Sequence, residues 1–106
     1  MPRPLLALLS AGLLLSAAAL GLAQATVNVQ VRRSSGGAGE AVVRLAAEAG
    51  GRTFQCRTRE GRCRIGGVPG GAYVVTAEPT DGGERPRPRS VLIPPTGDTE
   101  LIVTLP

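Results

Sequence analysis

The sequence lacks the side chains on which most enzyme active sites depend. It has no histidine and no lysine, and all twelve of its basic residues are arginine, against eight acidic residues. Without an imidazole, no side chain readily exchanges a proton near neutral pH, and without lysine there is no amine for a Schiff base. We therefore expect a non-catalytic protein.

Aromatic residues are equally scarce, because Phe54 and Tyr73 are the only two and tryptophan is absent. Proteins that bind single-stranded nucleic acids stack the bases on aromatic side chains, so no nucleic-acid partner is expected despite the net charge of +4. Tyr73 is followed at alternate positions by Val75 and Ala77. This spacing predicts that Tyr73 belongs to a hydrophobic core and does not serve as a ligand platform.

A long apolar run at the amino terminus is typical of a secretory signal peptide. Arg3 supplies a positive charge, residues 5–22 are largely apolar, and residues 23–25 form the small-x-small triplet of a cleavage site. An uncleaved membrane anchor is the alternative, because the run approaches the roughly 20 residues of a spanning helix. With residues 1–25 removed, residues 26–106 form an exported domain, periplasmic or extracellular, that has no stable membrane span.

The rest of the chain alternates apolar and polar residues in the way typical of β-strands. A short helix over Glu40–Ala49 is an alternative at one place, where the following Gly50-Gly51 favours a strand. Val74 puts an apolar residue on the nominally outer face of its strand, which indicates a central strand covered on both sides. We expect an all-β fold, a seven-stranded antiparallel Ig-like or transthyretin-like sandwich. The seven predicted strands are Val27–Val31, Ala41–Leu45, Arg52–Thr58, Arg62–Ile65, Ala72–Glu78, Ser90–Ile93 and Asp98–Leu105.

Residues 61–79, GRCRIGGVPGGAYVVTAEP, carry a family resemblance: a turn glycine and a short strand lead to Gly-Val-Pro-Gly-Gly and Tyr-x-Val-x-Ala. This order resembles the carboxypeptidase regulatory-like domains of the transthyretin-like, prealbumin-type sandwiches, and also the B-type repeats of surface proteins. A Val-x-Val opening near Val27 and Leu-x-Val-x-Leu at residues 101–105 extend the resemblance over most of the domain. It implies a structural or protein-interaction module whose partner is another envelope or extracellular protein.

Cys56 and Cys63 are the only two cysteines. They lie on opposite arms of a proposed hairpin, directly opposite each other if Arg59 and Glu60 form its loop, and this spacing suits a disulfide. A metal site would need more ligands than two thiolates, and redox pairs usually lie two residues apart at a helix start. Because exported proteins usually pair their cysteines, we predict a structural disulfide, with no metal and no cofactor.

Arg85, Arg87 and Arg89 alternate with two prolines and form the one stretch with a predicted ligand. Their guanidinium groups suit the anions of acidic polysaccharides or lipid phosphates. An extended backbone would align the three side chains on one face, whereas a polyproline helix would spread them around its axis. The alternative, which we favour, is that proline and charge keep a sheet edge from pairing with other chains.

Overall fold

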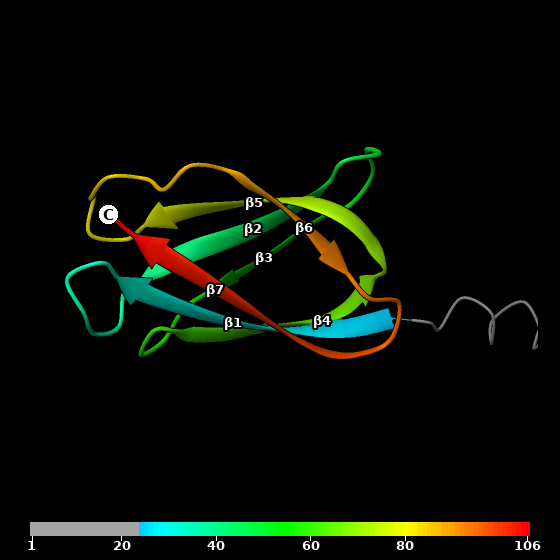
Figure 1. Ribbon diagram of the computed structural model, residues 1–106, viewed down its shortest axis with the longest axis horizontal. Coiled ribbons are helices and arrows are strands. Elements are labelled where there is room, and N and C mark those ends of the chain that lie inside the picture. Colours follow the sequence, from blue (N-terminus) through cyan, green and yellow to red (C-terminus); the bar gives the residue numbers. More distant parts are fainter. Residues whose placement is uncertain (1–23) are drawn as a thin grey trace, which may run out of the picture.

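The computed structural model describes residues 24–106, so most of the predicted signal peptide lies outside the described residues. This part of the chain forms seven β-strands and contains no helix, hence none long and apolar enough to cross a membrane (Figure 1). The helical alternative for Glu40–Ala49 was therefore wrong. The strands are β1 (Gln24–Arg33), β2 (Ala41–Ala47), β3 (Thr53–Arg57), β4 (Arg62–Pro69), β5 (Gly71–Pro79), β6 (Arg89–Ile93) and β7 (Gly97–Leu105).

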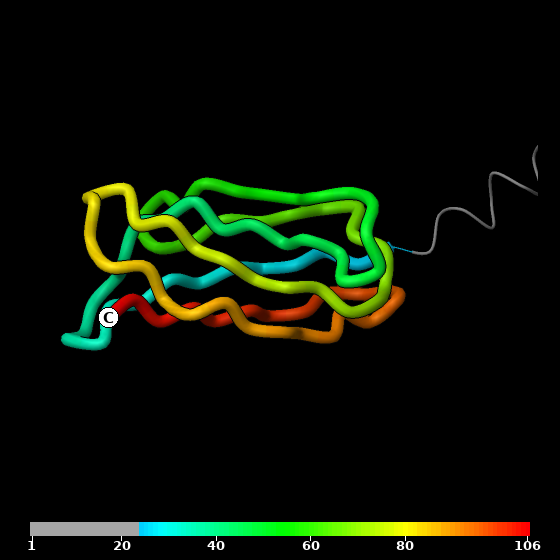
Figure 2. Tube along the Cα trace, turned by 90° about the horizontal axis from the view of Figure 1, so that it is seen from above, coloured from blue at the N-terminus to red at the C-terminus, as the bar shows by residue number. Residues whose placement is uncertain are grey.

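The strands form two stacked sheets, seen from one side in Figure 1 and from above in Figure 2. The three-stranded sheet has the order β4-β1-β7, and the four-stranded sheet has the order β3-β2-β5-β6. The predicted antiparallel sandwich is confirmed, with one exception in its strand pairs: β1 and β7 run parallel. The chain reaches β7 from β6 in the other sheet, so no hairpin forces β7 to run against β1.

Alternate residues of the strands fill the space between the sheets, as the sequence pattern predicts. Tyr73 is only 4% exposed, and its hydroxyl donates a hydrogen bond of 2.6 Å to the Pro69 carbonyl. On the outer face of β5, Val74 is half-buried and Thr76 is exposed. β5 therefore lies inside its sheet, and no second layer from residues 24–106 covers it. The largest fully buried side chains are those of Leu45, Leu105, Val27, Val31, Val43 and Val68.

β4 continues beyond its predicted end at Ile65 and reaches Pro69. The register of β4 against β1 shifts between Ala25 and Val27, where β4 contains an extra residue. Gly67 has a φ of 69° at this bulge, a backbone conformation that glycine adopts readily. The bulge allows Ile65 and Val68 both to face the core. Of the glycines in Gly-Gly-Val-Pro-Gly-Gly, Gly66 and Gly67 therefore lie at a bulge within β4, whereas Gly70 and Gly71 lie where the chain turns from β4 into β5.

β1 begins two residues before the start expected for the mature chain, since Gln24 and Ala25 are its first residues. Ala25 pairs with Val68 of β4 and Gly97 of β7, and it is 1% exposed. Cleavage after Ala25 would therefore remove a core residue from the domain.

Candidate functional site

A covalent link closes one side of the sandwich. Cys56 in β3 and Cys63 in β4 form a disulfide, with 6.0 Å between their Cα atoms. β3 and β4 are edge strands of different sheets, so the bond joins the two sheets to each other. The structure contains the disulfide that the sequence predicts, but the hairpin proposed to carry it was wrong, because β3 and β4 do not pair. We call this side of the sandwich the closed side.

A tight turn connects β3 and β4 on the closed side. Its two central residues are Glu60 and Gly61, and both have positive φ, 56° and 76°. Such a pair of conformations is typical of a type I′ turn. Arg59 and Arg62 exchange two backbone hydrogen bonds of 2.9 and 3.1 Å across it. The arms then separate into different sheets, and the disulfide spans the space between them.

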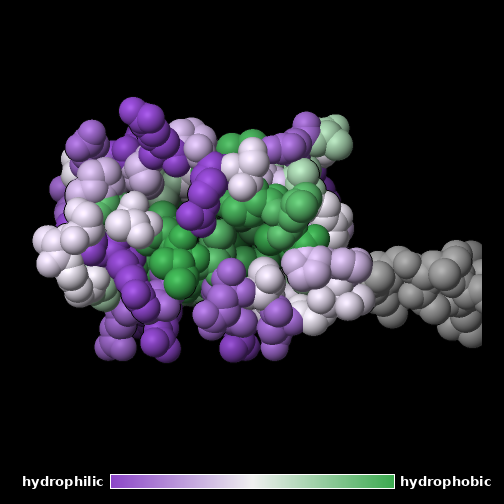
Figure 3. Space-filling model, viewed as in Figure 1, coloured by the Kyte–Doolittle hydropathy of each residue, from purple (hydrophilic) through white to green (hydrophobic). Residues whose placement is uncertain are grey.

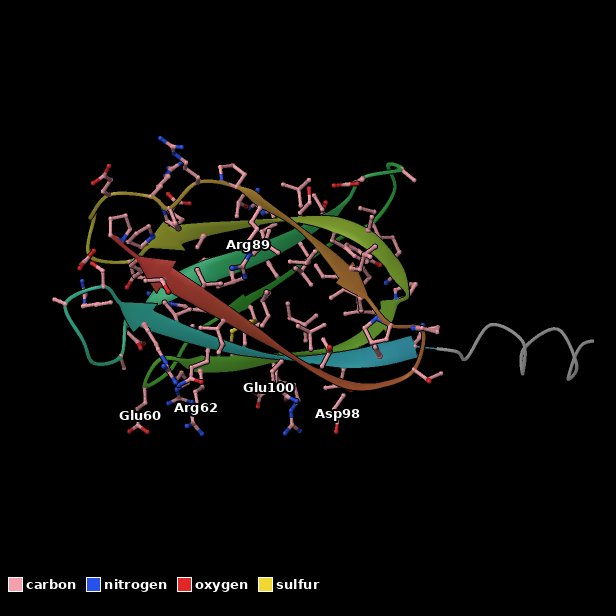
Figure 4. All side chains as sticks on the ribbon, viewed as in Figure 1. Glu60, Arg62, Arg89, Asp98 and Glu100 are labelled. Carbon is pink, nitrogen blue, oxygen red and sulfur yellow. A yellow bond between two sulfur atoms is a disulfide. The ribbon has the colours of Figure 1, made fainter. Side chains whose placement is uncertain are left out.

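The opposite side of the sandwich, which we call the open side, is formed by β6 and β7. Each is the edge strand of its own sheet, and the two lie next to each other at the front of Figure 1. Within residues 24–106, one hydrogen bond links β6 to β7: Arg89 Nη2 donates to the Ile102 carbonyl at 2.8 Å. Figure 4 labels Arg89. Figure 3 shows apolar surface between the two edges, where the core is visible from outside.

A cleft of about 140 Å³ lies in this gap beside Arg89. It is roughly the size of a cavity that holds a benzene ring, so it can take one apolar side chain. Its apolar walls come from the inner faces of β5 and β7, and arginine side chains stand at its rim. The lining residues are Val75, Ala77, Pro86, Arg87, Arg89, Val103 and Thr104.

Two large apolar side chains are exposed on the strands of the open side. Leu92 of β6 is 82% exposed and Ile102 of β7 is 42% exposed. Each lies on the outer face of its strand, since Ile93, Leu101 and their alternate neighbours point into the core. An edge strand with exposed apolar side chains and unpaired backbone groups is a surface on which another chain can pair.

The structure separates the three arginines that the sequence placed together. Arg85 forms an ion pair with Glu78 at 3.0 Å on the outer face of the four-stranded sheet. Arg87 and Arg89 instead line the cleft on the open side. Pairing of β5 with β6 stops at Val75, so the proline-containing run lies beside the part of β5 that β6 leaves uncovered. This position fits its interpretation as protection for a sheet edge.

Sequence reasoning missed the open side as a site. One signal was available: Leu92 and Ile102 are apolar residues at positions where strand alternation predicts polar ones. Val74 is also apolar where a polar residue is expected, and it suggested a second covering layer, but no such layer lies over β5 among residues 24–106. What the alternation does not reveal is which strands lie at the edges of the sheets.

Comparison with known proteins supports the fold of this chain but does not assign it to a family. No protein-family model matches the sequence, and no curated protein matches it. Among solved structures, the minor pilin GBS52 of Streptococcus agalactiae matches 78% of this chain with a TM-score of 0.64 and 15% identity. The TIE protein of Bacillus anthracis matches 77% with a TM-score of 0.59 and 13% identity. The shared fold is a β-sandwich.

The chain spans less than half the length of either neighbour, 44% of the pilin and 16% of the TIE protein. At these identities the likeness concerns the fold alone. The resemblance to carboxypeptidase regulatory-like domains therefore remains a prediction from the sequence.

Proposed function

We propose that this chain is an exported, non-catalytic interaction module that binds another protein along its open side. The observation that carries this proposal is the gap between β6 and β7, where the core borders a cleft and Leu92 and Ile102 are exposed. Burial of exposed apolar surface is the main driving force of most protein association. A partner lying on this side covers both exposed side chains and the two unpaired strand edges.

Three observations support an exported structural module. The disulfide between Cys56 and Cys63 is typical of oxidising compartments outside the cytoplasm. The apolar run at residues 5–22 with the following small-x-small triplet is typical of a signal peptide. One neighbour of the same fold is a minor pilin. Together they favour a role in the cell envelope or outside the cell.

The test is crosslinking from defined positions in the cells that produce the protein. A photoreactive amino acid replaces Leu92 or Ile102 on the open side, or Gln55 on β3 as an exposed control on the closed side. We expect a discrete adduct of higher mass from the first two positions and none from Gln55. The same adducts from all three positions, or none from any, would contradict a binding site on the open side.

We further propose that processing leaves Gln24 as the first residue of the exported protein. A cut after Ala23 also satisfies the small-x-small rule, because Gly21 occupies the third position before it. This cut retains Ala25, which is buried between β4 and β7. Mass measurement of the protein from its native compartment distinguishes the two cuts, and a chain beginning at Thr26 would refute this one.

Anion binding by Arg85, Arg87 and Arg89 is the alternative function, for acidic polysaccharide or lipid phosphate. The geometry supports it less well, because Arg85 is paired with Glu78 and Arg89 donates to the Ile102 carbonyl. Retention on a heparin column that falls with salt, and that is lost when all three arginines are replaced by alanine, would favour this alternative.

A further inference from the structure

The geometry of the open side points to the chemistry of the partner. We propose that the partner adds an extended segment to the free edge of β7, with one apolar side chain in the cleft and a carboxylate bound to Arg87. This inference rests on the proposed function and specifies how the open side would be occupied.

The three-stranded sheet has room for a further strand at β7. β7 is nine residues long, and among residues 24–106 its single strand partner is β1. The Leu105 carbonyl accepts from the Ser34 amide on the β1 side, whereas the Ile102 carbonyl accepts from Arg89 across the gap. Because alternate residues of a strand direct their backbone groups to the same side, Glu100 and Thr104 face the gap together with Ile102. These three residues offer a ladder of donors and acceptors to an added strand.

The cleft lies where a side chain of that added strand would point. Its walls include Val75 and Ala77 on the inner face of β5 and Val103 on the inner face of β7. A strand beside β7 directs every second side chain toward the opposing sheet. One of these side chains reaches the cleft, which is large enough for a single apolar group. The side chains on the other face of the strand cover Ile102.

Charge at the rim favours an acidic segment. Arg87 has no ion pair and no hydrogen bond among residues 24–106. An added strand that donates to the Ile102 carbonyl releases Arg89 from its bond, so two guanidinium groups become available for a carboxylate. A second copy of this chain is a poorer occupant, because it would bring its own Arg87 and Arg89 to the same gap and place like charges together.

The test uses the processed protein and two fluorescein-labelled peptides. Each nine-residue peptide alternates valine with threonine and has phenylalanine at one inward position. One peptide has a glutamate beside the phenylalanine, and the matched peptide has glutamine there. We expect the glutamate peptide to bind about tenfold more tightly, since a hydrogen-bonded charge pair is lost in the other. We expect it to shift the amide resonances of Glu100, Ile102 and Thr104.

Three variants separate the parts of the proposal. Ile102→Pro removes an amide that faces the gap and is not needed for pairing with β1, so the fold is retained and binding is lost. Arg87→Gln abolishes the preference for glutamate over glutamine. Arg85 binds Glu78 on the outer face of the four-stranded sheet, away from the cleft. Arg85→Gln therefore leaves the affinities for both peptides unchanged. A glutamate peptide methylated on alternate backbone nitrogens gives the same test of strand pairing on the unaltered protein, and we expect it not to bind.

Several results would overturn strand addition at β7. One such result is that the methylated peptide binds as tightly as the unmethylated glutamate peptide, or that the resonance shifts are confined to strands other than β7. Another is that neither peptide binds, or that the glutamate and glutamine peptides bind with equal affinity. Protection of the β7 amides that rises with protein concentration and needs no peptide would show a second copy as the occupant. Crosslinks from Leu92 and Ile102 would still support the proposed function in each of these cases, so the two failures are distinguishable.

Discussion

The two sides of the sandwich are held together in different ways. On the closed side, a disulfide, a type I′ turn and a pair of backbone hydrogen bonds connect the two sheets within eight residues, Cys56 to Cys63. On the open side, the link between edge strands that the structure describes is one hydrogen bond from Arg89 to Ile102. A domain of this size buries a limited core, so links of this kind carry a large share of its stability.

This difference suggests that the closed side mainly stabilises the fold and that the open side mainly serves binding. Restraints on the closed side fix the two sheets relative to each other, so the open side keeps its shape without pairing its own edges. A partner can then occupy the gap without first displacing a strand of the domain. Changes on the closed side are therefore expected to destabilise the fold, and changes on the open side to affect binding.

The largest expected effect is loss of the disulfide. Replacing Cys56 and Cys63 together by alanine removes a short closed loop, which should lower the free energy of unfolding by about 2–3 kcal/mol in the chain-entropy model. The melting temperature should fall by roughly 10–20 °C. Urea unfolding measures the change. A double variant as stable as the unaltered protein would show that the closed side does not depend on its covalent link.

The next effect concerns Thr58, a buried polar residue at the end of the closed side. Its Oγ1 accepts a hydrogen bond of 2.9 Å from the Ala41 amide, and its own amide donates to the Ala41 carbonyl at 3.0 Å. Thr58→Val keeps the shape but leaves the Ala41 amide without an acceptor, so it should cost about 1–2 kcal/mol. Thr58→Ser, which keeps the hydroxyl, is the matched control and should cost less. The hydrogen bond would be unimportant if serine proved the worse replacement.

A smaller effect, of opposite sign, is expected at Glu60. This residue has a φ of 56°, which non-glycine residues adopt at a cost. Glu60→Asn creates the Asn-Gly pair that type I′ turns favour, so the free energy of unfolding should rise by about 0.5–1 kcal/mol. Thermal unfolding measures the gain, with the exposed Glu84→Asn in a loop as a control. A fall in stability at position 60 would mean that the Glu60 side chain stabilises the turn in some other way.

The strands themselves were predictable from the sequence, because burial between two sheets requires an apolar residue at every second position. Val27, Val43, Val75 and Val103 obey this rule, and each is buried in the strand where it was expected. The alternation gives the face of each residue but not the neighbour of its strand. The parallel pairing of β1 with β7 joins the two ends of the domain, and nothing local in either strand indicates it.

The candidate site depended on this missing information. The cysteines were predicted as a pair from their compartment, but their position between two sheets follows from where β3 and β4 pair. The Arg-Pro run identified Arg87 and Arg89 as candidate binding residues. Its spacing did not indicate that the run places Arg85 beside Glu78 and Arg89 beside the Ile102 carbonyl. The open side exists because β6 and β7 are both edge strands, a property of the whole topology.

The smallest expected effect tests how the loop before β6 is held. Asp81 in this loop accepts a bond of 2.8 Å from Arg33 at the end of β1. This bond, together with a backbone bond from Gly83, lowers the pKa of Asp81 from its ordinary value. A lowered pKa contributes stability above the unfolded pKa of about 3.9, and this contribution is lost as the pH falls through the folded value.

Asp81→Asn should therefore be slightly less stable than the unaltered protein at pH 7, and the two should become equal in strong acid. The effect is small because both side chains are partly exposed, 39% for Arg33 and 47% for Asp81, so solvent and salt screen the pair. Thermal unfolding at several pH values and two salt concentrations measures the difference. A gap between the two proteins that persists below the folded pKa would show that the effect of Asp81 does not come from its charge. Within residues 24–106, this ion pair is the one hydrogen-bonded link between the loop and β1, so the contrast with the disulfide would be greatest at low pH.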